Sequence, residues 1–189
     1  MDMNFEKYYK LAESRLSNRR YTHSVNVAAA AVKLAKKYGC DVQKAELAGI
    51  LHDITKETDA ENQLQIINAG GIILDDVSKS SPQLYHAISG MVYCRDTLGI
   101  DDEDILNSIR YHTTARAGMS LLEKIIFTAD FISDERDYED VDVMRARCEV
   151  SLEEGMLYGL GFVIPDIVRK ERAIHPDALS AYNELVLNR

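Results

Sequence analysis

The stretch Leu51-His52-Asp53-Ile54-Thr55-Lys56-Glu57 begins near the end of a predicted helix. Helical spacing places His52 on the same stripe as Ala45 and Ala48, so its imidazole is expected to face inward among small apolar residues. Asp53 adds a carboxylate beside it. A His-Asp pair arises easily by chance, and Asp53 could simply end a helix, so the meaning of the pair depends on the rest of the chain.

Helix start and stop signals recur along the chain and predict an all-α protein of about eight to ten helices. Only three prolines and ten glycines interrupt it, and no long stretch alternates polar and apolar residues as a strand would. The predicted helices cover residues 5–17, 23–38, 42–53, 59–69, 82–98, 101–112, 121–132, 141–160, 163–172 and 177–187. Residues 72–80 are predicted to form a loop.

Capping residues define several of these boundaries. The predicted caps and capping boxes are Thr22, Asp41, Thr58 with Glu61, Ser81 with Pro82, and Ser120 with Glu123. Gly39 and Gly70-Gly71 are predicted to end helices. Pro165 is predicted to kink or break the C-terminal helical region, because its ring excludes one helical hydrogen bond.

Further side chains extend the His-Asp pair into a candidate metal site. The full set is His23, His52, Asp53, His86, His112 and Asp130. Asp130 lies on an otherwise apolar helix, where an unpaired buried carboxylate is costly. Each histidine taken alone is more commonly a hydrogen-bonded core residue, but nitrogen and oxygen ligands on separate helices are how helical bundles build metal centres. His175 lies outside the set and is expected to be structural or peripheral.

Composition and charge restrict the class of ligand. The net charge of -9 argues against a long polyanion, since nucleic-acid binders display a basic stripe, but a small phosphorylated ligand needs only local cations. The charged start of the chain argues against a signal peptide, and the lack of a run of about 18 apolar residues argues against a membrane span. We therefore expect a cytoplasmic protein. Cys40, Cys94 and Cys148 form no CxxC pair and are expected to be reduced thiols.

The 189 residues, 46% of them hydrophobic, suffice for one substantial core. We therefore expect a single domain over residues 1–189. Its metal-binding core is expected at about 18–135, with C-terminal helices at about 141–187 packed on it.

Longer motifs surround the candidate ligands. They are Arg20-Tyr21-Thr22-His23-Ser24, Leu51 through Glu57, His86-Ala87, Tyr111 through Ser120, Lys124 through Asp130, and Ile174-His175-Pro176. On these motifs, nearly the whole chain resembles the HD-domain phosphohydrolases, and more closely the YqeK family of bacterial dinucleoside tetraphosphate hydrolases. The His-Thr-Thr-x-Arg-Ala-Gly-Met segment that starts at His112 is far more specific than the His-Asp pair. The resemblance implies an HD-domain helical bundle.

The resemblance also implies a two-metal centre. One metal would be held by His23, His52, Asp53 and Asp130, and a second by His86 and His112, with Asp53 bridging the two. The family implies iron, whereas the ligand chemistry itself permits iron, manganese, cobalt, nickel or zinc. Single-metal members of the wider superfamily need only part of the first set, so the two further histidines favour two metals.

Three cations near the ligands are candidate phosphate clamps, namely Lys56, Arg116 and Arg136. Asp53 and Lys56 are the candidate catalytic residues. The hydroxyls of Thr113 and Thr114 could bind phosphate or satisfy a helix end. A Lys or Arg near a helix end is usually a solvated or dipole-compensating charge, so that alternative stays open for each cation.

Two departures from the family pattern affect the substrate loops. Ala115 stands where the family has glycine, and Ser133-Asp134-Glu135 replaces Glu-Pro-Asn or Glu-Pro-Gly before Arg136.

The implied function is that of a symmetrical bis(5'-nucleosyl)-tetraphosphatase, which hydrolyses diadenosine tetraphosphate to two ADP. Two metals would lower the pKa of a bound water and hold the phosphate oxygens. The alternatives are an HD-type phosphohydrolase acting on mononucleotides or guanosine alarmones, and a nucleotide-sensing module without turnover. We expect a small nucleotide substrate, no nucleic-acid or membrane partner and, by family habit, a homodimer.

Overall fold

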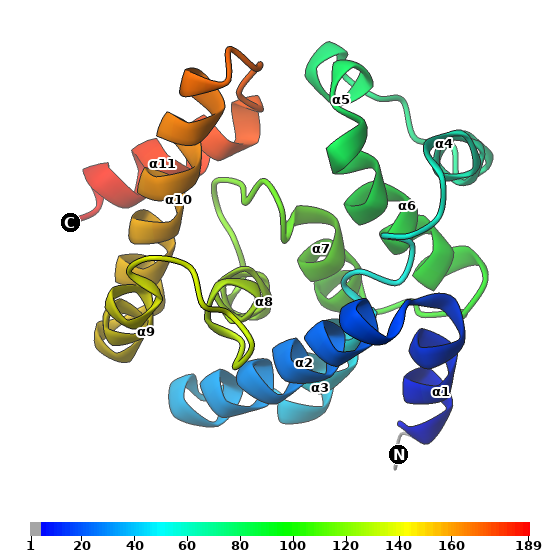
Figure 1. The fold of residues 1–189 in the computed structure, drawn as a ribbon, viewed down its shortest axis with the longest axis horizontal. Helices are drawn as coiled ribbons and strands as arrows, with labels where there is room; N and C mark the ends of the chain where they lie inside the picture. Colours follow the sequence, from blue (N-terminus) through cyan, green and yellow to red (C-terminus); the bar gives the residue numbers. More distant parts are fainter. Residues whose placement is uncertain (1–4) are drawn as a thin grey trace.

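The computed structural model describes residues 5–189 (Figure 1). Over this range the chain forms eleven α-helices, one 3₁₀ helix and no strand, which confirms the all-α prediction and exceeds the expected number of helices. The elements are α1 (Glu6–Arg15), α2 (Asn18–Tyr38), α3 (Val42–Leu51), α4 (Ala60–Ala69), α5 (Asp76–Ser80), the 3₁₀ helix η1 (Pro82–Leu84), α6 (Tyr85–Asp96), α7 (Glu103–Tyr111), α8 (Leu121–Ile132), α9 (Val141–Val150), α10 (Leu152–Arg169) and α11 (Pro176–Leu187). No helix in the described range is long and apolar enough to cross a membrane. Residues 1–4, on which the expectation about a signal peptide partly rests, lie outside the described residues.

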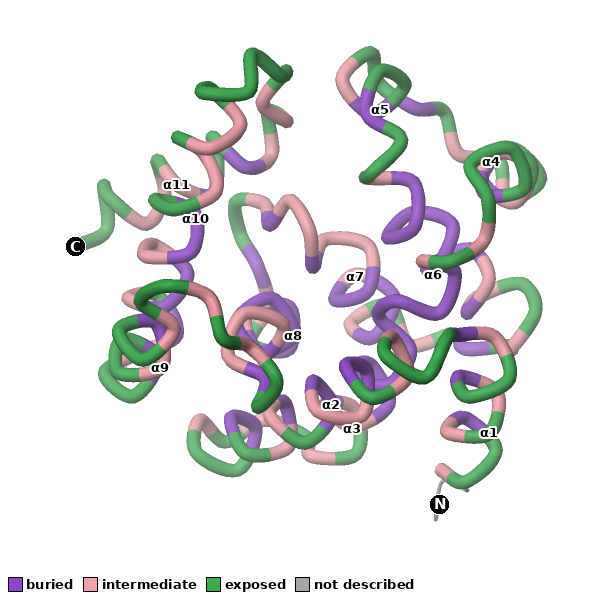
Figure 2. The backbone as a smooth tube through the Cα atoms, in the orientation of Figure 1, coloured by how far each residue is buried: buried purple, intermediate pink, exposed green. Residues whose placement is uncertain are grey.

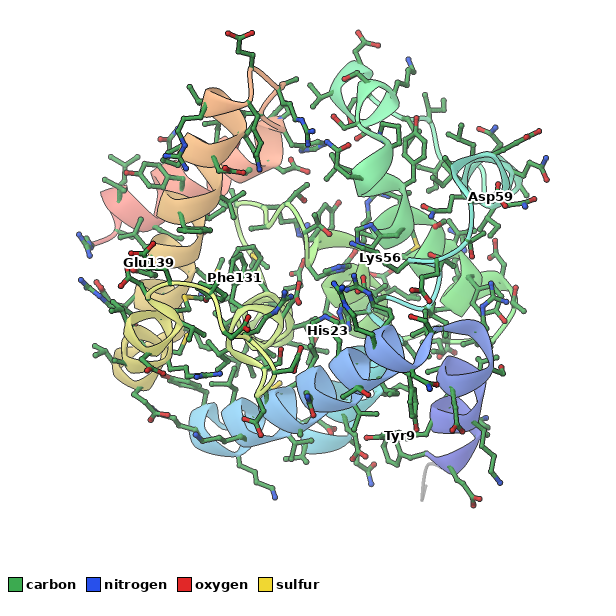
Figure 3. All side chains as sticks on the ribbon, viewed as in Figure 1. Tyr9, His23, Lys56, Asp59, Phe131 and Glu139 are labelled. Carbon is green, nitrogen blue, oxygen red and sulfur yellow. The ribbon has the colours of Figure 1, made fainter. Side chains whose placement is uncertain are left out.

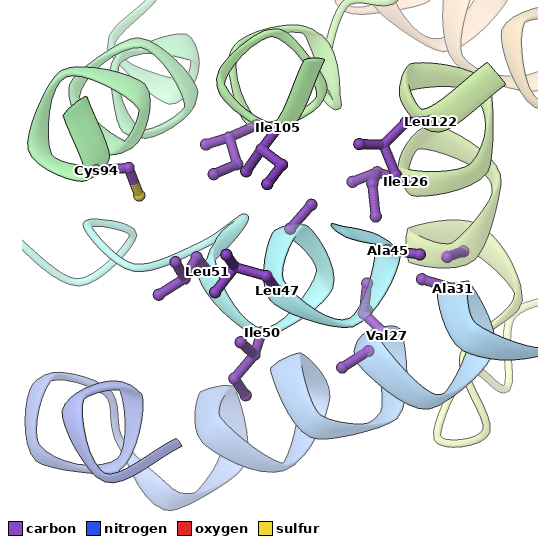
Figure 4. Packing of buried hydrophobic residues seen from close by; sticks show 14 of the residues in the cluster. Val27, Ala31, Ala45, Leu47, Ile50, Leu51, Cys94, Ile105, Leu122 and Ile126 are labelled. Carbon is purple, nitrogen blue, oxygen red and sulfur yellow. The ribbon is translucent and has the colours of Figure 1, made fainter. Parts of the chain in front are cut away.

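Helix α3 lies at the centre of the larger hydrophobic core. It contacts α1 and α2 on one side and α7 and α8 on the other, as the close-up in Figure 4 shows. Its buried residues are Ala45, Leu47, Ala48, Gly49, Ile50 and Leu51. Burying each large aliphatic side chain contributes about 1.5–3 kcal/mol, so the end of α3 is held firmly in place.

Helices α2 and α3 cross very closely at Gly49. A Cβ added to Gly49 would lie 2.6 Å from the Cα of Ala28, a distance that no side chain tolerates. This close approach brings His23 of α2 beside His52 at the end of α3, with ring centroids 5.2 Å apart.

A second hydrophobic cluster joins α8 to the C-terminal helices. Phe127 of α8 packs in this cluster with Met156 and Leu160 of α10 and with Ala178 of α11. Figure 2 shows buried segments in the first part of α10, while its last turns are exposed or intermediate and α11 has both exposed and partly buried residues. Because α8 contributes residues such as Ile126 to the first cluster as well, it ties the C-terminal helices to the rest of the fold.

Two predicted helix starts are wrong, because a nearby side chain caps the helix instead. Ser17 caps α2, whereas Thr22 lies inside that helix and its hydroxyl donates a hydrogen bond of 2.8 Å to the Asn18 carbonyl. Asp59 caps α4 in place of Thr58. An aspartate carboxylate binds backbone N–H groups more strongly than a threonine hydroxyl does, which explains the second shift. The predicted caps at Asp41 and at Ser120 with Glu123 are confirmed.

The segment predicted as a loop over residues 72–80 contains the short helix α5. Asp75 caps it by accepting hydrogen bonds from the backbone N–H groups of Val77 and Ser78. The helix predicted over 82–98 is divided into η1 and α6.

The helix predicted over 141–160 is divided at Ser151, and no break occurs at Pro165. Ser151 is extended and its hydroxyl accepts a hydrogen bond of 3.0 Å from the backbone N–H of Glu154, which ends α9 and starts α10. Helix α10 continues through Pro165, where the cost is one missing backbone hydrogen bond near the helix end.

Candidate metal centre

The six predicted metal ligands converge at the centre of the molecule, around the position of His23 in Figure 3. They come from five helices or helix ends: His23 of α2, His52 and Asp53 after α3, His86 of α6, His112 after α7, and Asp130 of α8. All are buried except Asp130, which is partly buried.

Two groups of ligand atoms lie close enough together to hold a cation. In the first group, His23, His52 and Asp130 each offer one ligand atom, and these atoms lie within 4.8 Å of one another. The second group, which meets the same criterion, is His52, Asp53 and His112. The Nε2 atom of His23 is 3.1 Å from Oδ1 of Asp130.

The two carboxylate oxygens of Asp53 face different imidazoles. Oδ2 lies 3.5 Å from Nε2 of His52 and 3.8 Å from Nε2 of His23. Oδ1 lies 3.3 Å from Nε2 of His86 and 3.6 Å from Nε2 of His112. This is the placement that a carboxylate shared by two cations requires.

Three ligand atoms are buried without a hydrogen-bond partner in the described part of the chain, namely His23 Nε2, His52 Nε2 and Asp53 Oδ1. A buried polar atom left without a partner costs about 1–3 kcal/mol. Cations bound among them would satisfy all three. The donor set of imidazole nitrogens and carboxylate oxygens therefore fits divalent metal ions.

Backbone carbonyls orient two of the imidazoles. Nδ1 of His52 donates to the Gly49 carbonyl and Nδ1 of His112 donates to the Ile109 carbonyl, each over 2.7 Å. Each Nδ1 thus carries the proton, and each Nε2 presents its lone pair toward Asp53. Burial lowers the pKa of His52 to about 4, so this imidazole is neutral and able to bind a metal at pH 7.

Two cations flank Asp53. Nη1 of Arg20 is 3.0 Å from Oδ2, and Nζ of Lys56 is 3.8 Å from Oδ1 and 3.0 Å from Nε2 of His86. Burial alone would raise the pKa of the Asp53 carboxyl, but the neighbouring imidazoles and Lys56 outweigh burial and hold it well below its usual range. Arg20 was missed by the sequence analysis, although its position three residues before His23 places both on one face of a helix.

Arg136 lies at the site as a partner of Asp130. Its Nη2 is 2.5 Å from Oδ1 of Asp130, and its Nε donates to the Asp130 carbonyl over 2.8 Å. Burial opposes ionisation of Asp130, but His23 and Arg136 outweigh it and hold the pKa of this carboxyl far below its usual range.

Glu135 is a second residue that the sequence analysis did not assign to the site. Its Oε1 accepts a hydrogen bond from Nδ1 of His23, and its Oε2 accepts one of 2.7 Å from Asn26. The Ser133 hydroxyl also donates to Oε1, over 2.8 Å. Glu135 belongs to the segment Ser133-Asp134-Glu135, and its carboxylate orients His23.

We expect Glu135→Ala to weaken metal binding by about 10- to 100-fold, the usual effect of removing a carboxylate that orients a ligating histidine. The affinity is measured by titrating Mn²⁺ into protein stripped with a chelator. Glu139→Ala is the matched control, because Glu139 is exposed in the same segment. Equal affinities for Glu135→Ala and the wild type would show that the carboxylate does not orient His23.

The two threonines predicted to bind substrate have different surroundings. The Thr113 hydroxyl lies 3.1 Å from Nε2 of His112 and 3.3 Å from Nε2 of His86, so it faces the site. The Thr114 hydroxyl donates to the carbonyl of Ala115 over 2.9 Å. Ala115 has a φ of +56°, in the left-handed region where a residue with a Cβ pays roughly 1–2 kcal/mol, which explains the family's glycine there.

The structure ties Arg116 to a different partner. Its guanidinium forms two hydrogen bonds, of 2.7 and 3.0 Å, with the buried carboxylate of Glu123. Glu123 also closes the capping box that starts α8. Arg116 therefore holds the loop after α7 against α8, and its role as a phosphate clamp stays a prediction.

His175 lies outside the ligand set, as expected. Its Nδ1 accepts a hydrogen bond of 3.2 Å from the backbone N–H of Asp177 and so caps α11. Its Nε2 lies 3.2 Å from both Ser78 Oγ and Asp75 Oδ2, which links α11 to α5.

The chain is similar to known proteins in both sequence and structure. The HD domain family matches residues 20–134. Proteins named "Bis(5'-nucleosyl)-tetraphosphatase, symmetrical" are 40% identical in Halalkalibacterium halodurans, over 98% of both chains, and 36% identical in Bacillus subtilis, over 97% of this chain and 98% of the relative. A crystal structure described as that of a predicted HD superfamily hydrolase involved in NAD metabolism, from Clostridium acetobutylicum, superimposes with a TM-score of 0.95 at 34% identity over 98% of both chains.

Proposed function

The chain belongs to the HD domain family and, within it, to the relatives named symmetrical bis(5'-nucleosyl)-tetraphosphatase, and from this premise we propose that it hydrolyses diadenosine tetraphosphate to two ADP. The observation that carries the proposal is Asp53, whose two oxygens face two different pairs of imidazoles. A carboxylate between two cation sites suits the displacement at one phosphorus of a polyphosphate chain.

We propose that His23, His52, Asp53 and Asp130 hold one metal and that His86 and His112, with Asp53 shared, hold the second. Metals bound there would supply Lewis acidity, which lowers the pKa of a water and neutralises phosphate charge. Iron is our proposal for the metal, from the family resemblance, and manganese, cobalt, nickel and zinc are compatible with the same donors.

The chain's own residues position the substrate. Lys56 and Arg20 place positive charge on the side of Asp53, and the Thr113 hydroxyl faces the same space. Phosphoryl transfer depends mainly on positioning and charge neutralisation, which fits a set of fixed cations rather than a covalent nucleophile. We propose that Lys56 contacts a phosphate of the bound chain, because its ammonium is partly exposed while it points at Asp53 and His86.

We also propose a location and an oligomeric state for the enzyme. The cysteines at 40, 94 and 148 are free thiols, which supports the proposed reducing, cytoplasmic location. A homodimer is proposed from the family resemblance alone.

The position of cleavage tests the function directly. The protein is purified anaerobically and incubated with diadenosine tetraphosphate in water labelled with oxygen-18. We expect ADP as the only product, with the label in one of the two ADP molecules of each turnover. Mass spectrometry of the products measures both. AMP with ATP as primary products, or faster consumption of a mononucleotide or guanosine alarmone, would contradict the proposal. Binding of the nucleotide without any turnover would instead favour a sensing module.

A further inference from the structure

The loop between α8 and α9, residues 133–140, carries two side chains that contact candidate metal ligands (Figure 1). Glu135 accepts a hydrogen bond from His23, and Arg136 pairs with Asp130. Both side chains start from irregular backbone rather than from a helix. Whatever fixes this loop therefore also fixes the two contacts at the metal centre.

The C-terminal end of α8 needs partners for its backbone carbonyls, because the last four carbonyls of a helix have none within it. In α8 these belong to residues 129–132, among which there is no Lys or Arg. The partners of the first three are, in order, the backbone N–H of Ser133, Nε of Arg136 and the hydroxyl of Tyr138. The fourth carbonyl, that of Ile132, accepts a hydrogen bond from Arg145 of α9.

Arg145 binds the start and the end of the segment that contains Glu135. Its Nε donates to the Ile132 carbonyl over 3.4 Å, and its Nη2 donates to the carbonyls of Ser133 and Arg136, each over 3.2 Å. A guanidinium presents its donors in a rigid fork and stays charged, so one side chain can hold three carbonyls. Its charge also lies at the negative end of the α8 dipole.

Resting on the proposed function, we propose that Arg145 is a positioning residue of the metal centre. Its contacts on either side of Glu135 fix the backbone from which that carboxylate reaches Nδ1 of His23. The imidazole then keeps its Nε2 directed at the first metal position, beside Asp130. Arg145 acts through the loop and not at the reacting atoms.

Arg145→Ala should weaken the binding of one of the two metal ions by about tenfold, the lower end of the range for groups that orient a ligating histidine. The other ion should bind as in the wild type, because the loop contacts ligands of the first position alone. Titration of Mn²⁺ into protein stripped with a chelator, with free Mn²⁺ followed by electron paramagnetic resonance, measures both affinities. Arg145→Lys keeps the charge but loses the fork, so its loss should lie between those of the wild type and the alanine variant.

The same substitution in a Glu135→Ala background tests whether Arg145 acts through Glu135. Two residues that act through one contact are not additive, so the second substitution adds little to the first. We expect the loss caused by Arg145→Ala to fall from about tenfold to about twofold or less. A general loss of stability would instead lower the affinity by the same factor in both backgrounds.

Two further variants of α9 are matched controls. Met144 is buried, and its Cε would lie 3.4 Å from a Cβ added to Gly159 of α10. Met144→Ala leaves a cavity there, so it should lower the Tm without changing the Mn²⁺ affinity. Arg147→Ala removes an exposed arginine that pairs with Glu154, and it too should leave the affinity unchanged.

Unchanged Mn²⁺ affinity in both Arg145 variants would overturn the inference, as would equal losses in the two backgrounds or an equal loss in Met144→Ala. If Arg145→Ala does not fold, Arg145→Lys in both backgrounds carries the same test. A protein that shows the expected losses but cleaves no diadenosine tetraphosphate would contradict the proposed function and support the role of Arg145. A wild-type protein that binds no Mn²⁺ would overturn both.

Discussion

Asp53→Ala should remove most of the bound metal and lower the turnover of diadenosine tetraphosphate by about 1,000-fold or more, since metal assistance is worth several kcal/mol of transition-state stabilisation. The physical reason is the position of Asp53 between two pairs of imidazoles, where each carboxylate oxygen faces one pair. Elemental analysis of the purified variant gives the metal content, and product release under initial-rate conditions gives the turnover.

Two controls make this result specific. Asp101→Ala changes an exposed aspartate and should leave metal content and rate unchanged. Asp53→Asn keeps the shape of the side chain but removes its charge, so it should lose metal nearly as completely as alanine does. A variant of Asp53 that kept both metals and a near-normal rate would exclude the bridging role.

His112→Ala and His86→Ala should each lower the metal content from two ions per chain toward one. The imidazoles of His86 and His112 face Oδ1 of Asp53, whereas those of His23 and His52 face Oδ2. We expect the greater loss for His112. The Ile109 carbonyl fixes Nδ1 of His112, and His112 belongs to the same group of close ligand atoms as His52. Among residues 5–189, Nδ1 of His86 has one hydrogen-bonding neighbour, Lys56 at 3.4 Å. Metal stoichiometry measured after removal of loosely bound ions checks both variants.

His175→Ala is the control for these two substitutions. It removes the fifth histidine and the cap of α11, so it should cost about 1 kcal/mol of stability while the metal stoichiometry stays at two. Retention of two metals by both His86→Ala and His112→Ala would show that these residues do not form a second position.

Much of the candidate site could be predicted from the sequence because its members sit at helix ends and on apolar stripes. His52 follows the small residues of α3, and Asp130 stands on an otherwise apolar helix, so both were expected to face inward. The all-α fold and the capping box at Ser120 followed from equally local signals. Local signals failed where two capping residues competed, as at Thr58 and Asp59.

Residues that act through another side chain escaped the sequence analysis. Glu135 reaches His23 from 112 positions away, and no local pattern reports such a contact. Arg116 stood at the right spacing for a phosphate clamp, yet its guanidinium is bound by Glu123. Such pairings depend on which side chains the packed helices bring together.

The sequence by itself determined that this chain is helical and which imidazoles and carboxylates are available as ligands, because periodicity and caps are properties of neighbouring residues. Only the tertiary structure decided which oxygen of Asp53 each imidazole faces. That division depends on the crossing of α2 and α3, where the absence of a side chain at Gly49 lets the two helices approach until His23 and His52 share one carboxylate oxygen.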